Sequence, residues 1–385
     1  MDFRPAEEQA AAAGLAAEIF HDLATHERLT AAGTGTDAEL WKALTTAGLP
    51  AAVPDIGLLG LVLMLEEQGR TTAQVPLAAT CVYGIHAVAA HGSAEQRARL
   101  LPALAAGEAV ATGAFPARPG RVTAGPGGRL TGTLPAVPWL RDATHVLVPD
   151  TDRALWLVRT DAPGVATEPV ETTAPWAAGR LTLTDAEAEP LGGPETDGAY
   201  GPATRNRSYA NPDAYDAVLA VARTAFAGLQ AGVCAGSLAR AVAYTSTREQ
   251  FGRPLSTNQA VLLRAADAHM DTEAIRVTAY EAAWRIDQGL PAREHALTTA
   301  WWASEAGKRV VHAGQHLHGG MGADLDHPVH RHFLWGRQLD AYLGCGSELL
   351  AELGAVLAQD EADDAQDEAG DAQDEAGDGT KELKA

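Results

Sequence analysis

An arginine and a pair of glycines in the second half of the chain have the residue types needed to hold a phosphate group. Arg248 lies in the segment YTSTREQFG, and its planar guanidinium offers a fixed fork of donors that matches phosphate oxygens. Phe251 follows three residues later and can supply an apolar face. Gly319 and Gly320 are adjacent in HGGMG, and without a Cβ they let the backbone approach a ligand closely. These residues predict a cofactor site; the alternative is a surface ion pair at Arg248 and a plain helix terminator at the glycines.

Six histidines lie close together in the same part of the chain, and neutral imidazole is a common metal ligand. They are His312, His316, His318, His327, His330 and His332. Their spacing matches no known metal motif, and no HExxH or CxxC accompanies them. We therefore expect no metal site.

Hydrophobic periodicity divides the chain into helices, then strands, then helices. Residues 1–110 have helical patterns, with Asp37 as the expected N-cap of one helix and a capping box opening another at Ser93. Residues 111–205 consist of short apolar segments broken by Gly and Pro, including a hairpin signature around 125–128. This middle third is predicted to be a small β domain.

Long helical patterns return in residues 206–358, where helices are expected at 213–247, 258–289, 291–316 and 327–357. Four such helices predict a bundle. Residues 359–385 contain two copies of Asp-Ala-Gln-Asp-Glu-Ala-Gly and almost no apolar residues. We expect this acidic tail to be disordered.

Composition narrows the classes of function. The chain has 385 residues and 46% hydrophobic content, which is enough for a large core. Its net charge of -21 argues against nucleic acid as a partner. Three widely separated cysteines fit a reducing compartment, and we see neither a signal peptide nor a membrane-spanning run of about 20 apolar residues. A soluble, cytoplasmic protein without a membrane partner is expected.

The order of elements, together with the two motifs, resembles the acyl-CoA dehydrogenase family. YTSTREQFG with the following Pro254-Leu255 looks like the family's RxxFG signature, and HGGMG resembles its GGxG segment. The resemblance covers the chain to about residue 358. It implies an α+β, mostly α fold: an N-terminal helical domain, a middle β domain and a C-terminal four-helix bundle. It also implies FAD as cofactor and an acyl-CoA thioester as substrate.

In the family, the two motifs reach across a subunit interface to hold the ADP half of the flavin. The resemblance therefore implies an oligomer. The residues that it implies for cofactor binding are Arg248, Phe251, Asn258, Gln315, His316, Gly319, Gly320 and Tyr342.

The glutamate that removes the α proton in this family has no counterpart at either of its two known positions. Counting without gaps from Gly319, the first position is Leu343; counting back from Arg248, the second is Ala222. Neither side chain can accept a proton. Asp340, three residues before Leu343 and about one helical turn away, is a candidate substitute base. An ordinary surface or capping role for Asp340 is the alternative.

The β domain also departs from the family pattern. The polar loop that contacts flavin and thioester is replaced by Pro116 to Gly120, and the tryptophan that faces the flavin ring is matched at best by Trp139. The sequence thus favours a base-deficient subunit of a heteromeric acyl-CoA dehydrogenase of the kind known from actinobacterial steroid degradation, in which a paralogue brings the base. Two alternatives remain open: a catalytically inactive homo-oligomer that binds a ligand or partner, and an enzyme that uses Asp340.

Overall fold

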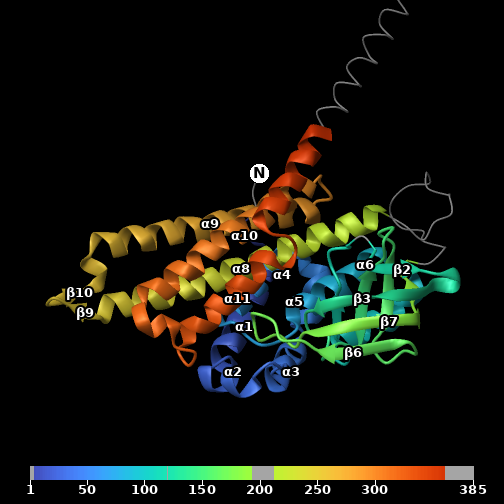
Figure 1. Cartoon of the computed structure of the whole chain (residues 1–385), viewed down its shortest axis with the longest axis horizontal. Helices are drawn as coiled ribbons and strands as arrows, with labels where there is room; N and C mark the ends of the chain where they lie inside the picture. Colours follow the sequence, from blue (N-terminus) through green and yellow to red (C-terminus); the bar gives the residue numbers. More distant parts are fainter. Residues whose placement is uncertain (1–3, 119, 193–211, 360–385) are drawn as a thin grey trace, which may run out of the picture.

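The computed structural model describes residues 4–118, 120–192 and 212–359. Helices come first, strands second and long helices last, so the predicted mostly α fold with a central β domain is confirmed. In Figure 1 the long helices extend to one side of the molecule and the β domain lies at the other, with α1 to α3 below them. The predicted disorder of the acidic tail concerns residues that, from 360 onward, lie outside the described ranges.

Two of the N-terminal helices begin at the caps that the sequence predicts. They are α1 (Glu7–Leu23), α2 (His26–Ala32), α3 (Ala38–Thr46), α4 (Leu49–Thr71), α5 (Leu77–Ala79), the π-helical turn η1 (Thr80–His86), α6 (Ala87–His91) and α7 (Ala94–Ala105). The Asp37 carboxylate accepts from the Leu40 N–H at 3.1 Å. Ser93 and Gln96 form the expected capping box, with side-chain bonds of 3.1 and 2.9 Å in opposite directions.

A residue of the C-terminal bundle caps the second half of α4. The helix kinks at Gly57, whose φ is +69°, and the Asp287 carboxylate accepts from the N–H groups of Leu58 and Leu59 at 2.6 and 2.9 Å. A Cβ at position 57 would lie 2.7 Å from that carboxylate, so glycine is required for the contact. The N-terminal helices and the bundle are thereby joined by hydrogen bonds as well as by packing.

The β domain is built from two four-stranded sheets. Its strands are β1 (Ala111–Gly113), β2 (Val122–Ala124), β3 (Arg129–Val137), β4 (His145–Pro149), β5 (Leu155–Arg159), β6 (Val165–Pro169), β7 (Gly179–Glu187) and β8 (Glu189–Pro190). The sheet orders are β1-β4-β5-β8 and β2-β3-β7-β6, and the pair β1 and β4 is parallel. The predicted hairpin is the antiparallel pair β2 and β3. Side chains of both sheets, such as Val146 and Leu181, share one apolar core.

The C-terminal bundle consists of long helices around a buried central one. Its elements are α8 (Pro212–Thr247), the short strands β9 (Glu249–Gln250) and β10 (Arg253–Pro254), η3 (Leu255–Thr257), α9 (Gln259–Asp287), α10 (Arg293–Leu317), η4 (Gly319–Ala323) and α11 (Pro328–Tyr342). The fourth predicted helix is not continuous, and that prediction is wrong at 343–345. Gly344 has a φ of +127°, which ends α11 and allows a separate C-terminal helix over 346–359.

Three helices have the length and apolar composition of a membrane span, so the expectation that no segment reaches that length is wrong. They are Leu49–Thr71, Ala214–Thr247 and Pro328–Gln359, the last of which counts α11 and the C-terminal helix together across the break at 343–345. In the first two, 72% and 89% of the most apolar window is buried inside the protein. Their composition therefore matches an interior position in the helical core. In the third, 22% of that window is buried.

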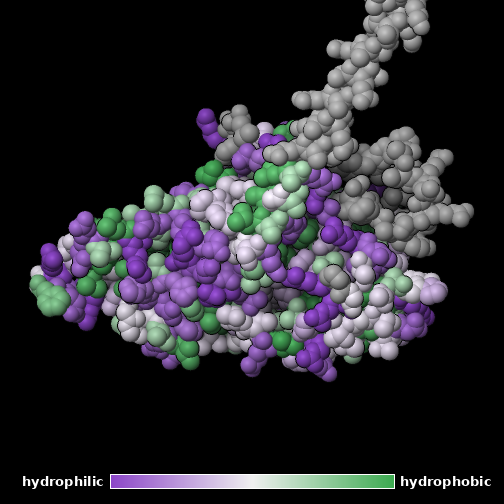
Figure 2. Space-filling view, turned by 45° about the horizontal axis from the view of Figure 1, so that its top comes forward, coloured by the Kyte–Doolittle hydropathy of each residue, from purple (hydrophilic) through white to green (hydrophobic). Residues whose placement is uncertain are grey.

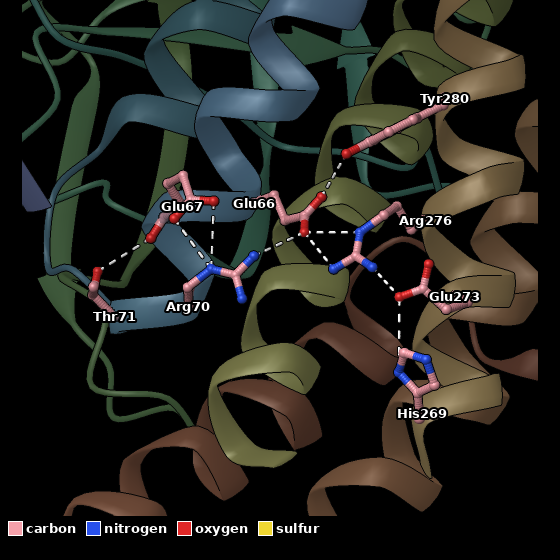
Figure 3. Close-up of polar contacts among 8 residues, drawn as sticks. All are labelled: Glu66, Glu67, Arg70, Thr71, His269, Glu273, Arg276 and Tyr280. Carbon is pink, nitrogen blue, oxygen red and sulfur yellow. Dashed lines mark hydrogen bonds and ion pairs between the residues drawn. The ribbon is translucent and has the colours of Figure 1, made fainter. Parts of the chain in front are cut away.

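A buried carboxylate also links α4 to α9. Figure 3 shows Glu66 on α4 facing Arg276 and Tyr280 of α9. Glu66 accepts from Arg276 at 2.9 and 2.6 Å, from Tyr280 at 2.9 Å and from Arg70 at 3.2 Å. Its side chain is only 6% exposed, and both carboxylate oxygens are satisfied, as a buried charge requires.

Candidate functional site

The two predicted cofactor motifs meet at one end of the bundle. The rings of Tyr244, near the end of α8, and His318, just after α10, stack at 4.9 Å. Arg248 follows Tyr244 by one turn, and its N–H donates to the Tyr244 carbonyl at 2.8 Å. Gly319 follows His318 directly. Residues about 70 apart in sequence are thus brought to the same end, which in Figure 1 carries β9 and β10 and lies farthest from the β domain.

The side chains of this end are free to meet a partner. Phe251, at the tip of the β9–β10 turn, is 101% exposed, and Figure 2 shows hydrophobic colouring at that tip. Arg248 is exposed, and within the described residues its guanidinium has neither an ion pair nor a hydrogen bond. The structure therefore does not contain the surface ion pair that was the alternative for Arg248. Asn258 caps α9 by accepting from the Ala260 N–H at 3.0 Å.

The glycine pair is open to a ligand on its Cβ side. A Cβ placed on Gly319 or Gly320 would meet nothing within 4 Å, and Gly319 has a φ of +61°. Gln315 holds the turn by donating from Nε2 to the Gly322 carbonyl at 3.0 Å. His316 is exposed beside it. A fork of arginine donors, an exposed aromatic ring and an accessible backbone turn together fit a dinucleotide phosphate.

Tyr342 lies elsewhere. Its hydroxyl is 3.0 Å from that of Tyr83, and its ring packs against Phe226 at 4.9 Å. It is the last residue of α11. A flavin contact by Tyr342 stays a prediction, and it would involve a different part of the cofactor from Arg248.

The two positions of the missing base are close to one cavity. Leu343, 6% exposed, lines a cavity of about 270 Å³, and so does Arg223, the neighbour of Ala222 on α8. Ala222 itself is fully buried. The contact between Phe226 and Tyr342 brings these parts of α8 and α11 together. Since neither Leu343 nor Ala222 can be protonated, this cavity has no base at the family positions.

Asp340 does not line that cavity. Its carboxylate lies 3.1 Å from Arg337 Nε, and its backbone carbonyl accepts from the Ser304 hydroxyl of α10 at 2.7 Å. Burial raises the pKa of Asp340, against the opposing effect of the Arg337 charge. The charges that act on this carboxylate come from Arg337 of α11 and from Lys308 and Glu305 of α10. The cavity does contain Glu348, which pairs with Arg118 at 3.7 Å and accepts from the Cys345 N–H at 3.2 Å.

Aromatic side chains fill the space beside the cavity. The rings in contact are Tyr83, Phe115, Tyr215, Phe226 and Tyr342, with centroid distances of 4.9 to 6.2 Å. Phe115, in the segment after β1, thus packs between the rings of Tyr83 and Tyr215. The polar contacts that the resemblance assigns to the following loop are absent from residues 116–118, where the Ala117 N–H donates to the Tyr215 hydroxyl at 3.0 Å.

Trp176 covers the tryptophan that the resemblance places beside the flavin ring. Trp139 is buried with a φ of +58°, and its ring is 6.3 Å from that of Trp176. Trp176 is itself buried and contacts Trp335 at 5.6 Å. Sequence reasoning missed this contact, because Trp176 belongs to an irregular segment between β6 and β7 that carries no signal for where it packs.

The histidines make structural contacts. His318 Nδ1 bonds to the Gly314 carbonyl at 2.7 Å, and His332 lies between the carbonyls of Pro328 and Arg70 at 3.2 and 3.0 Å. Among residues 4–118, 120–192 and 212–359, no group of three or more His, Cys, Asp or Glu side chains is arranged to hold a metal ion.

Comparison with known proteins identifies the family. Residues 6–108 match the acyl-CoA dehydrogenase N-terminal domain, and residues 213–355 match the acyl-CoA dehydrogenase C-terminal domain. Acyl-CoA dehydrogenase FadE27 of Mycobacterium tuberculosis is 35% identical over 352 residues, covering 85% of this chain and 90% of FadE27. The chain belongs to the acyl-CoA dehydrogenase family. Acyl-CoA dehydrogenases are FAD-dependent oxidoreductases that act on CH–CH groups.

Two similar solved structures carry the names of two components each. One is a variant of the Tcur3481-Tcur3483 steroid ACAD; it is 40% identical, with a TM-score of 0.81 and coverage of 92% of this chain and 99% of that chain. The other is the ChsE4-ChsE5 complex from Mycobacterium tuberculosis, which is 32% identical, with a TM-score of 0.83 and coverage of 93% and 99%. Proteins with two named components are thus among the solved structures that this chain resembles.

Proposed function

We propose that this chain is the base-free subunit of a heteromeric, FAD-dependent acyl-CoA dehydrogenase that desaturates the α,β bond of an acyl-CoA thioester. In this proposal a paralogous subunit supplies the glutamate that takes the α proton. This chain supplies Arg248, Phe251 and the Gly319-Gly320 turn to the flavin of that paralogue.

The observation that carries the proposal is a contrast between the two parts of the site: the base positions hold residues that cannot ionise, whereas the predicted flavin contacts are present and exposed. Leu343 and Ala222 are buried and cannot ionise, whereas Arg248 and Phe251 are exposed at the far end of the bundle. Arg248, which has no partner among the described residues, and the open Gly319-Gly320 turn lie at the same end of the bundle, which favours a shared role in binding flavin. The two-component names of the similar structures support a paralogous partner.

The chemistry assigns different tasks to the two subunits. FAD, when bound, supplies the acceptor for the hydride that leaves the β carbon. Arg248 would hold a phosphate oxygen through two N–H donors, and the Gly319-Gly320 backbone would allow close approach. Positioning of this kind contributes to rate without proton transfer. In this chain Trp176 packs against Trp139. This contact argues against a flavin of this chain's own, in addition to that of the paralogue, with its ring at Trp139.

The test is to purify the full chain alone and after co-expression with an acyl-CoA dehydrogenase paralogue that carries the glutamate. We expect the isolated chain to reduce no artificial electron acceptor with straight-chain or steroid acyl-CoA, and the co-expressed pair to bind flavin and react. General-base catalysis is worth about a hundredfold to ten-thousandfold. Robust turnover by the isolated chain would refute the proposal and favour another carboxylate, such as Asp340.

A second candidate function is a catalytically inactive homo-oligomer that binds a ligand or partner. The filled aromatic region around Tyr83 and Phe226 favours it. Under this reading the chain purifies as one species, does not associate with a paralogue and contains no flavin. Flavin absorbance and subunit composition of the co-expressed sample separate the two candidates.

A further inference from the structure

The cavity beside Leu343 is lined by charged side chains, which is unusual for a space next to an acyl site. Its walls come from the segment after β1, the β4–β5 turn, the start of α8 and the C-terminal helix. The charged residues are Arg118, Arg153, Asp216, Arg223, Glu348 and Glu352. An apolar acyl chain placed there would remove these groups from water without replacing their hydrogen bonds, at a high cost in free energy. The cavity is therefore suited to a polar ligand.

Two of the three arginines have donors that no acceptor occupies. Arg118 lies 3.7 Å from Glu348 and Arg153 lies 3.5 Å from Asp216, and neither guanidinium makes a hydrogen bond with a described residue. Arg153 also lies over the ring of Tyr215, 5.1 Å from its centroid. All four side chains in the two ion pairs are 36% to 54% exposed, so the pairs contribute little to stability. Both guanidiniums can therefore turn toward a ligand with little loss.

Two buried donors of the cavity wall also have no acceptor among the described residues. Arg223 is 7% exposed, and its Nε has no partner within the described part of the chain. Its two terminal nitrogens are held by Glu352 at 2.9 and 2.6 Å. Tyr215 accepts from the Ala117 N–H, which leaves the phenol proton without a described acceptor. Burial raises the pKa of Tyr215, so the hydroxyl remains a donor at neutral pH.

We propose that this cavity binds the oxyanion of a small molecule, a carboxylate or a phosphate, through Arg118, Arg153 and the Tyr215 hydroxyl, with Arg223 adding its positive charge. Charge-assisted bonds from arginine forks suit either group. The volume of about 270 Å³ lies just below the range of about 300 to 1,000 Å³ for drug-sized ligands, so the ligand is a small acid and not a whole acyl-CoA. The site requires neither flavin nor a partner subunit.

A second cavity provides the matched control. It has a volume of about 400 Å³ and also contains three arginines, Arg99, Arg129 and Arg159. In contrast to the first cavity, each of these side chains already donates to an acidic partner, at 2.6, 3.3 and 2.7 Å respectively. An arginine removed from this cavity tests for general effects of surface charge.

The experiment is equilibrium dialysis of the full chain, in whatever assembly it purifies, against labelled inorganic phosphate and, separately, labelled succinate. Chloride is adjusted to keep the ionic strength constant. We expect one saturable site per chain for at least one of the two anions, and that anion identifies the ligand class. Arg118→Gln and Arg153→Gln should each weaken binding about tenfold or more, whereas Arg159→Gln should leave it unchanged.

Both variant positions are about half exposed, so the fold should tolerate the change, and far-ultraviolet circular dichroism checks this. Absence of saturable binding of either anion by the wild-type protein would overturn the proposal. Equal weakening by Arg153→Gln and the control Arg159→Gln would do the same, because it would indicate diffuse attraction to positive charge.

Discussion

Replacement of Glu66 by Gln tests the buried network that joins α4 to α9. The substitution keeps the size of the side chain but removes the charge that faces Arg276 (Figure 3). The amide also puts a donor where the carboxylate accepted, so it cannot accept from Arg276, Arg70 and Tyr280 together. Removing one partner of a buried ion pair typically costs about 3 to 5 kcal/mol, because the other charge stays desolvated. Arg276 is 20% exposed and keeps its ion pair with Glu273 (Figure 3), which places the expected loss at the lower end, at about 3 kcal/mol.

The assay is urea denaturation at fixed protein concentration, followed by circular dichroism. Glu168→Gln is the matched control, since Glu168 pairs with Arg180 at 3.3 Å on the surface of the β domain and both side chains are about half exposed or more. We expect the control to be close to wild type. A loss below about 1 kcal/mol for Glu66→Gln would refute the reasoning, because it would mean that Glu273, water or relaxation compensates the charge of Arg276.

The remaining predictions concern the site and the response to pH. Arg248→Ala in the heteromer should weaken flavin binding by about 1.5 to 3 kcal/mol with little change in thermal stability; Arg253→Ala in the same turn is the control, and unchanged flavin absorbance would exclude Arg248 as a ligand. Leu343→Glu should not restore activity to the isolated chain, because the cavity beside it is lined by charged pairs; rapid flavin bleaching with any acyl-CoA would show that only the glutamate was missing. Burial holds the pKa of His332 at about 4, whereas the unfolded chain takes up that proton near its ordinary pKa of about 6.5. Stability should therefore fall by about 3 kcal/mol between about pH 6.5 and 4 on account of this residue, and denaturation of His332→Gln across that range should give a shallower slope.

Local features of the fold were predictable where short-range chemistry decides them. The caps at Asp37 and Ser93 depend on a side chain and a backbone N–H three residues away, so their sequence signatures are sufficient. The β2–β3 hairpin likewise follows from its glycines. The break between α11 and the C-terminal helix was missed, since Gly344 lies inside an otherwise continuous helical pattern and only its φ of +127° ends the helix.

The candidate site divides in the same way. The sequence by itself determined that Leu343 and Ala222 cannot act as bases, because the absence of an ionisable group is independent of conformation. It also supplied the arginine and the glycines of the flavin motifs. Only the tertiary structure decided that Arg248 and Gly319 meet at one end of the bundle, through the stacking of Tyr244 on His318.

Tertiary structure alone also decided that Trp176 covers Trp139, that the backbone of Asp340 bonds to α10, and that three arginines surround one cavity. Each of these facts is a contact between residues far apart along the chain. Helical periodicity and capping patterns depend on neighbours within about one turn. They therefore carry no information about which distant side chains line the same cavity. The physical reason is that long-range packing depends on the summed shapes of whole elements, which no single segment of the sequence contains.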